Sequence, residues 1–205
     1  IDDLGRVLGK EEEASLMANQ ISGYYGSILN RTGAIPDDDR PSVYFMSMGH
    51  IDWTGNRNST GHTRIVEAGG KNIAADLRTT VPHVDMEWVI EQDPEIIVYS
   101  MSQGQYNSTT PTIEEMKAKR DEIMAIPGFE NIDAVETGQD YITDIKMASG
   151  ISELATMLYY AKWLHPDLFN DIDPRAVHEE LLENYFDMDI EGIYQVYPDA
   201  PVKSE

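Results

Sequence analysis

The sequence of 205 residues contains no cysteine. Disulfide frameworks, thiolate zinc sites and cysteine nucleophiles are therefore excluded, because each requires a thiol group. Long apolar runs are also missing, since no stretch approaches the roughly 20 apolar residues that a membrane-spanning helix needs. The chain begins at Ile1 without a signal sequence, and we expect this end to lie inside a longer protein.

Positive charge is scarce in this chain. Lys and Arg number 15 against 37 Asp and Glu, which gives a formal net charge of −22. Direct binding to nucleic acid or to an anionic membrane surface is not expected, because both require cationic protein surfaces. Solubility is the simplest role of such an acidic surface, and attraction of a cationic patch on a partner protein is a second one.

Common catalytic motifs are absent as well. The sequence has no His-Glu-x-x-His helix, phosphate-binding loop, GxSxG elbow or GxGxxG turn, so neither a hydrolase nor a nucleotide enzyme is indicated. His50, Asp52, His62 and His83 offer nitrogen and oxygen ligands for a divalent metal, but their spacing matches no compact ligand motif. We expect a protein that binds rather than catalyses, with no catalytic residue, no resident metal and no cofactor.

What the sequence does contain is an alternation of helix and strand patterns. Parallel strands need crossover connections, and helices must cover both faces of such a sheet. The sequence therefore predicts an α/β fold, a three-layer lobe with a mainly parallel sheet flanked by helices, plus a long helix at the N-terminus. Helices are expected at residues 10–29, 60–68, 112–124, 150–164 and 173–185 and after Asp85, and strands at 43–46, 96–100, 134–135 and 141–143.

Local signals predict where several of these elements begin and end. Asp85 is expected to cap a helix, with Glu87 in the first turn, where negative charge is favoured. Thr112 begins a capping-box pattern, and His165 before a proline marks a helix end. The helix from about 150 to 164 reads as amphipathic, and His178 lies in a charged helix, where we expect it to be solvated.

Two motifs between residues 68 and 100 carry a resemblance. Gly69-Gly70-Lys71-Asn72-Ile73 follows an apolar helix, and Asp93-Pro94-Glu95-Ile96-Ile97-Val98 opens a strand. This arrangement resembles the second half of the substrate-binding proteins that serve importers of iron-siderophore, haem and cobalamin complexes, where "GG-x-N-I" precedes "D-P-[DE]-x-I-[IV]". The similarity extends through Ile126-Pro127-Gly128-Phe129 and the segment 164–169.

The resemblance implies a domain organisation and a location. Members of that family have two lobes joined by a long helix, so residues 1–35 correspond to the linking helix, residues 41–198 to the carboxy-terminal lobe, and the first lobe is absent. An extracytoplasmic protein is implied, periplasmic or on the cell surface, anchored to the membrane in its full-length form. Acceptor patterns for N-glycosylation at Asn30, Asn58 and Asn107 are compatible with export.

Ligands of open α/β sheets bind beyond the carboxyl ends of the strands, so three loops are candidates here. The first loop, 47–58, contains a flat apolar side chain, an imidazole that can bind a metal or a propionate group, and an amide. This combination suits a flat or bulky chelate. The second and third loops, 101–109 and 144–149, add hydrogen-bonding groups and a cation. The candidate ligand-binding residues are Met48, His50, Trp53 and Asn56, then Gln103, Gln105 and Tyr106, and finally Lys146.

Glu87 is a candidate of another kind. The segment Val84-Asp85-Met86-Glu87 corresponds to a "V-[ST]-x-E" segment in the family, whose acidic residue engages arginines on the permease. The resemblance therefore implies permease docking by Glu87. The local alternative is an exposed glutamate that only interacts favourably with the helix dipole.

These observations lead to one interpretation and several alternatives. The chain is interpreted as part of the substrate-binding component of an ABC importer, which captures a metal chelate of the iron-siderophore, haem or corrinoid type and delivers it to a permease in the membrane. The chelate is transported cargo. A receptor for a free metal ion that uses His50 and carboxylates, a metal-dependent hydrolase domain and a purely structural cell-surface module are the alternatives.

Overall fold

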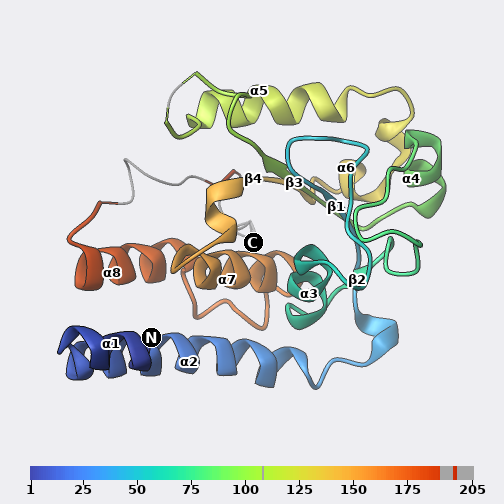
Figure 1. Ribbon diagram of the computed structural model, residues 1–205. Helices are drawn as coiled ribbons and strands as arrows, with labels where there is room; N and C mark the ends of the chain where they lie inside the picture. The colour runs from blue at the N-terminus through green and yellow to red at the C-terminus, as the bar shows by residue number, and fades with distance from the viewer. Residues whose placement is uncertain (108, 190–195, 198–205) are drawn as a thin grey trace.

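The computed structural model describes residues 1–107, 109–189 and 196–197. Within these ranges the chain forms a sheet of five strands in the order β2-β1-β3-β4-β5, with helices on both sides (Figure 1). The first four strands run parallel, and β5 pairs antiparallel to β4 at the edge. The predicted α/β fold with a mainly parallel sheet is confirmed. The strands are β1 (Ser42–Met46), β2 (Lys71–Asn72), β3 (Ile96–Met101), β4 (Asp140–Asp144) and β5 (Val196–Tyr197).

Helices connect these strands, and most of them lie close to the positions expected from the sequence. None of those in the described ranges has the length and apolar character that crossing a membrane requires. The α-helices are α1 (Asp2–Leu8), α2 (Glu11–Thr32), α3 (Thr60–Glu67), α4 (Met86–Gln92), α5 (Ile113–Met124), α6 (Asp133–Glu136), α7 (Ser152–Leu164) and α8 (Pro174–Phe186), and short 3-10 turns are η1 (Asp37–Asp39), η2 (Phe129–Asn131) and η3 (Ile145–Ala148).

The caps of these helices follow from their sequences. The Asp85 carboxylate accepts a hydrogen bond from the Trp88 backbone amide, as expected for the residue that starts α4. Thr112 and Glu115 form the complete capping box of α5. Asp173 caps α8, whose first residue is Pro174. Local chemistry alone therefore positions the starts of three helices.

Alternation along the strands divides the core into two clusters. Val43 and Phe45 of β1 belong to the cluster on one face of the sheet, whereas Tyr44 and Met46 belong to the cluster on the other. β3 alternates in the same way, because successive side chains of a strand point to opposite faces. In Figure 1, α5 lies over one face of the sheet, and α7 and α8 lie beyond the other. β1, β3 and β4 are buried on both faces, as a parallel sheet requires.

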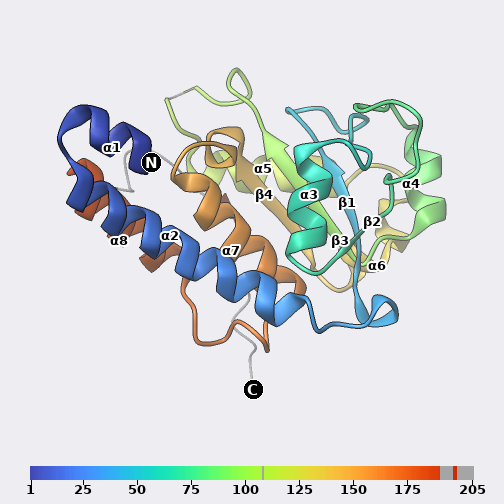
Figure 2. The ribbon, with the colours of Figure 1, turned by 60° about the horizontal axis from the view of Figure 1, so that its bottom comes forward.

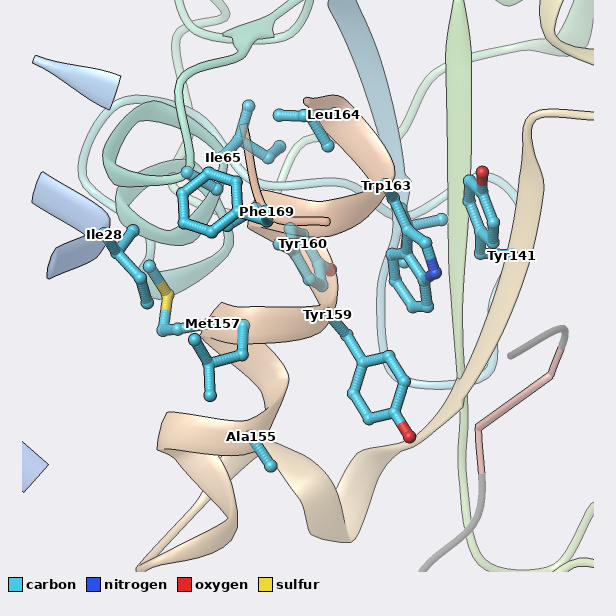
Figure 3. Close-up of a cluster of buried hydrophobic side chains, with 14 of the residues drawn as sticks. Ile28, Ile65, Tyr141, Ala155, Met157, Tyr159, Tyr160, Trp163, Leu164 and Phe169 are labelled. Atoms are coloured by element: carbon cyan, nitrogen blue, oxygen red, sulfur yellow. The ribbon is translucent and has the colours of Figure 1, made fainter. Parts of the chain in front are cut away.

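The largest buried side chain, Trp163, joins α7 to the sheet (Figure 3). Its indole stacks on the ring of Tyr141 in β4, with centroids 4.2 Å apart and planes 10° from parallel. Tyr159 and Tyr160 pack against the same indole, each with a centroid distance of 5.6 Å. The Trp163–Tyr141 stack thus forms the aromatic contact between the helix and the strand, and the two tyrosines of α7 pack beside it.

The apolar character of α7 extends around nearly its whole circumference. Its buried residues run without a break from Leu154 to Ala161, because the helix lies between the sheet, α8 and α2. α2 forms an additional outer layer, and its side chains Ile21, Tyr24 and Tyr25 pack against the first core cluster. The interpretation of this segment as amphipathic was therefore wrong, since a helix enclosed by other elements has no solvated face.

Residues 1–35 form two helices rather than one. α1 ends at Leu8, and the chain then reverses so that Gly5 packs directly against Ala14 of α2. α2, with 22 residues, is the long N-terminal helix expected from the sequence. Its C-terminal part is fastened by Arg31, whose guanidinium donates two hydrogen bonds of 2.6 and 2.8 Å to the carboxylate of Asp171.

One predicted strand is a helix. Ala134 and Val135 lie in α6, not in a strand that pairs with residues 141–143. The backbone amide of Ala134 donates to the Pro94 carbonyl oxygen, and that of Gln139 donates to the Ala134 carbonyl oxygen. These bonds attach the short helix to the segment just before β3, and they place the residue that precedes β4 next to it. The prediction failed because a two-residue apolar pair carries no period that distinguishes a strand from a helical turn.

His178 is buried, which contradicts its expected solvation. It lies on the face of α8 that packs against α7, and its Nε2 atom is 3.0 Å from the hydroxyl oxygen of Ser152. Burial lowers the pKa of His178 to about 4, an effect that the nearby Glu179 carboxylate only partly opposes. The neutral ring is therefore part of the α7–α8 interface.

The buried His178 predicts an acid-sensitive contribution to stability. The unfolded chain takes up a proton near pH 6.5, whereas the folded chain resists protonation until about pH 4. Stability is therefore lost as pH falls from 6.5 to 4, by up to roughly 3 kcal/mol. In urea unfolding at several pH values, His178→Gln should lack this part of the pH dependence. The same pH slope in both proteins would show that the ring is not held neutral.

The acidic surface predicts a dependence on salt. Glu183 is exposed on the last turns of α8, where it shares a hollow with Glu179, Asp187 and Asp189. Negative charges near a helix C-terminus repel one another and the dipole. Glu183→Gln should raise the melting temperature at 0.1 M NaCl and lose this advantage at 1 M, where the Debye length falls to about 3 Å. An advantage of equal size at both concentrations would contradict an electrostatic origin.

Candidate ligand-binding face

Three loops gather at one edge of the sheet, where β1, β3 and β4 end (Figure 2). They are the loops predicted from the sequence, 47–58, 101–109 and 144–149, of which residue 108 lies outside the described residues. The strands are parallel, so their carboxyl ends necessarily meet at the same edge. We call this edge, formed by the three loops, the carboxyl edge.

The first half of the first loop, residues 48–53, forms a compact turn that we call the tip. It carries apolar and aromatic side chains. The His50 imidazole stacks on the Trp53 indole, with centroids 4.0 Å apart and planes 14° from parallel. Met48 is 50% exposed at the same tip. A hydrogen bond of 2.8 Å from the Ser47 amide to the Trp53 carbonyl oxygen closes the loop. Three of the predicted residues are thus brought together on one surface.

His83 joins this tip from a distant part of the sequence. It forms an isolated antiparallel bridge with Trp53, and the two rings lie 4.9 Å apart at 60°. Its Nδ1 atom is 3.2 Å from the carboxylate of Asp52. The sequence had indicated His83 only as one of several metal-ligand candidates. Its place beside Trp53 depends on pairing between residues 52–56 and 80–84, which no local pattern reveals.

Asn56 is buried at 3% exposure and faces the protein interior. Its side-chain amide donates to the Leu77 carbonyl oxygen, and its side-chain oxygen accepts from the Asn58 amide. Asn72, from the Gly-Gly-Lys-Asn motif, donates to the Gly55 carbonyl oxygen at 2.7 Å. Both asparagine side chains thus stabilise the conformation of the first loop by hydrogen bonds to backbone groups. The motif drew attention to Asn72, but only the fold shows that its side chain bonds to Gly55.

His62, another residue weighed for the metal-binding alternatives, lies apart from the tip and next to Asn72, with 3.3 Å between its Nδ1 atom and the amide nitrogen. Burial lowers the pKa of His62, and the neighbouring Arg57 acts in the same direction. Within the described part of the chain, no group of three or more His, Cys, Asp or Glu side chains is placed to hold a metal ion.

The second and third loops meet through Tyr106, Asp144 and Lys146. The Tyr106 hydroxyl donates to Asp144 at 3.3 Å, and the Lys146 amide donates to the same oxygen at 3.1 Å. The Lys146 ammonium lies 5.8 Å from the centre of the Tyr106 ring and donates to the Thr109 carbonyl oxygen. Gln103 is exposed at the top of the second loop.

Burial governs the acid–base behaviour of this contact. It raises the pKa of the Asp144 carboxyl, which is fully buried, above the usual range, and the Lys146 amide and ammonium oppose that rise. It also raises the pKa of Tyr106 to about 12, with the Asp144 charge acting in the same direction. Tyr106 is therefore a neutral hydrogen-bond donor that links two loops, and only 7% of it is exposed.

An ion pair between α3 and α7 holds the third loop through a hydrogen bond to its backbone. Arg64 of α3 is buried and donates two hydrogen bonds, of 2.6 and 2.9 Å, to the carboxylate of Glu153. The same guanidinium donates to the Ala148 carbonyl oxygen at 3.2 Å. A bidentate, partly buried pair of this kind holds planar groups in one orientation. The loop after β4 is thereby attached to the helix after the first loop.

Glu87 is exposed in the first turn of α4. The helix begins at Met86, three residues after His83, and the Val84 amide donates to the Asp52 carbonyl oxygen at 2.9 Å. These contacts place the start of α4 beside the tip of the first loop. The predicted docking residue and the predicted ligand-binding tip consequently belong to the same edge of the molecule.

Sequence comparison matches residues 1–146 to the periplasmic binding protein family. The cobalamin-binding proteins of two Halobacterium salinarum strains, R1 and NRC-1, are each 30% identical to this chain over 116 residues. The match covers 54% of this chain and 30% of each relative. The matched segment thus covers less than a third of the length of these relatives.

Solved structures of the same class share the fold. The TroA-like periplasmic binding protein FepB of Veillonella parvula has a TM-score of 0.79 at 24% identity, covering 93% of this chain and 58% of that one. The nickel–histidine complex of Helicobacter pylori CeuE has a TM-score of 0.66 at 15% identity, covering 93% and 58%. At these identities the likeness establishes the fold alone.

The family match and the fold agree with each other. The matched region runs from α1 through β4 and into η3, so it includes the long N-terminal helix, all four parallel strands and the three strand ends that carry the candidate loops. It covers well over half of the sequence. The chain belongs to the periplasmic binding protein family.

Proposed function

We propose that this chain is the linking helix and carboxy-terminal lobe of the solute-binding protein of an ABC importer. The complete protein captures a metal chelate of the corrinoid, haem or ferric-siderophore type and delivers it to a permease in the membrane. Family membership supports the class of protein, and the partial coverage of FepB and of the cobalamin-binding proteins supports a second lobe outside this sequence. An extracytoplasmic location, with a membrane anchor on the full-length protein, belongs to the same proposal.

The observation that carries the ligand class is the tip of the first loop. Met48, His50 and Trp53 present a thioether, an imidazole and an indole together at the carboxyl edge. Stacked aromatic rings and a polarizable thioether favour a ligand with a broad apolar or conjugated surface. Lys146 and Gln103 lie on the neighbouring loops and supply a cation and an amide for polar groups at the rim of such a ligand.

Binding without chemical turnover is part of this proposal. Ligand pockets typically combine apolar side chains with a few placed polar groups that fix orientation, and the tip of the first loop, with Gln103 and Lys146 on the neighbouring loops, offers both kinds of group. Of the relatives named above, the Halobacterium proteins are described as cobalamin-binding and FepB as a periplasmic binding protein, and CeuE was solved with nickel and histidine. The free-ion alternative predicts binding of a bare divalent metal, and the ligand panel below includes it for that reason.

The first test is ligand binding by the full-length protein. Cobalamin, haem, ferric siderophores and bare Ni²⁺, Zn²⁺ and Mn²⁺ would be compared by calorimetry. We expect tight binding of one chelate, and Trp53→Ala should weaken it at least tenfold because the main apolar contact is lost. Phe186→Ala, which removes an exposed aromatic ring at the end of α8, is the matched control. Binding of the bare ions alone would show that the chelate proposal is wrong.

The docking role of Glu87 has its own test. Glu87→Arg in the full-length protein should abolish most transport in reconstituted vesicles and leave ligand affinity unchanged, because a reversed charge repels a basic patch on the permease. Glu91→Arg makes the same charge change one turn further along α4, at another exposed position. Equal transport by both variants and the original protein would remove Glu87 from docking.

A further inference from the structure

Gly49 is held by three hydrogen bonds at the carboxyl edge. Its carbonyl oxygen accepts a hydrogen bond of 2.7 Å from the Tyr99 hydroxyl and one of 2.9 Å from the Gln105 side-chain amide. Its own amide donates to the Ser100 carbonyl oxygen at 2.7 Å. Both hydrogen-bonding groups of this residue in the first loop are thus attached to β3 and to the second loop.

The Gln105 side chain is fully used in this arrangement. Its amide nitrogen donates to both the Gly49 carbonyl oxygen and the Tyr99 hydroxyl, the latter at 2.5 Å. Its side-chain oxygen accepts from the Ser102 amide at 2.8 Å. The glutamine therefore faces inward and bridges two loops, whereas the sequence had indicated it as a hydrogen-bond donor to the ligand.

Glycine is required at position 49. Its φ of +80° lies in the left-handed region, and a Cβ atom there would come within 2.5 Å of the Gln105 side-chain oxygen and 2.3 Å of the Ser102 hydroxyl. The preceding Met48 also has a positive φ, +56°, which is unusual for a residue that carries a Cβ atom. The hydrogen bonds around Gly49 hold this strained turn in place.

We propose that Gln105 and Tyr99 are positioning residues for ligand binding. By fixing Gly49, they hold Met48 in its left-handed conformation and hold His50 against Trp53, so that the apolar tip exists before a ligand arrives. A preformed surface loses less conformational freedom on binding, which raises affinity for a ligand with a flat or broad apolar face. This inference rests on the proposed function, because it assigns the tip of the first loop to the ligand.

The same sheet offers a matched control. At the opposite edge, the Tyr141 hydroxyl donates to the Gln139 side-chain oxygen at 2.6 Å, just before β4. Gln105→Leu and Gln139→Leu each remove a glutamine that bonds to a buried tyrosine. Tyr99→Phe and Tyr141→Phe form a second matched pair, which removes only the hydroxyl groups. If Gln105 and Tyr99 had a purely structural role, the two variants of each pair would have similar effects on ligand affinity.

Two measurements on the full-length protein test the proposal. The first is the NMR signal of the His50 ring, which the stacked Trp53 indole shifts. The second is affinity for cobalamin as the probe. Gln105→Leu should move the His50 signal toward the value of an unstacked imidazole and lower cobalamin affinity about tenfold. Tyr99→Phe should act in the same direction with a smaller effect, since Gly49 keeps its Gln105 bond.

The control variants decide the outcome. Gln139→Leu and Tyr141→Phe should lower the melting temperature without changing the His50 signal or cobalamin affinity. An unchanged His50 signal in Gln105→Leu, or an equal affinity loss in Gln139→Leu, would overturn the positioning role. If the unaltered protein does not bind cobalamin, corrinoid cargo is excluded from the proposed function, and the His50 signal alone then decides whether Gln105 organises the tip.

Discussion

The requirement that both faces of a parallel sheet be buried governs the rest of this structure. β1, β3 and β4 are covered by one apolar cluster on each side, and the crossover helices needed to run the strands parallel supply that cover. The same crossovers bring three strand ends to one edge, where the candidate loops lie. The Trp163 and Tyr141 rings form the aromatic contact between α7 and this sheet, and α2 packs outside α7. The long helix is therefore attached to the sheet through α7.

At the carboxyl edge, the loops owe their shape to polar contacts within the protein. Asn56, Asn72 and Gln105 bond to backbone groups of the loops, and the Arg64–Glu153 pair supports the loop after β4. At the tip of the first loop, Met48 and His50 are exposed and Trp53 is half-buried, with the exposed His83 beside them. The inward-facing polar side chains thus hold the loops together, and the aromatic rings at the tip are the groups that the proposed function assigns to a bulky ligand.

Much of the fold was predictable because its signals are local. Asp85, Thr112 and Asp173 cap helices where the sequence indicated, and the order of helix and strand patterns along the chain is enough to indicate the α/β class. The exceptions involve contacts between distant residues. Ala134 joins a helix that is held to Pro94, and His178 is buried because α8 packs against α7. Neither contact leaves a pattern in the neighbouring sequence.

The candidate site divides in the same way. The sequence by itself determined which strand ends carry loops and that Met48, His50 and Trp53 lie on the first of them, because parallel topology follows from the order of the elements. Only the tertiary structure decided that His83 joins this tip, that Asn56 faces inward and that Gln105 bonds to Gly49. The physical reason is that hydrogen bonding and burial of a polar side chain depend on which distant backbone groups the fold brings within about 3 Å of it.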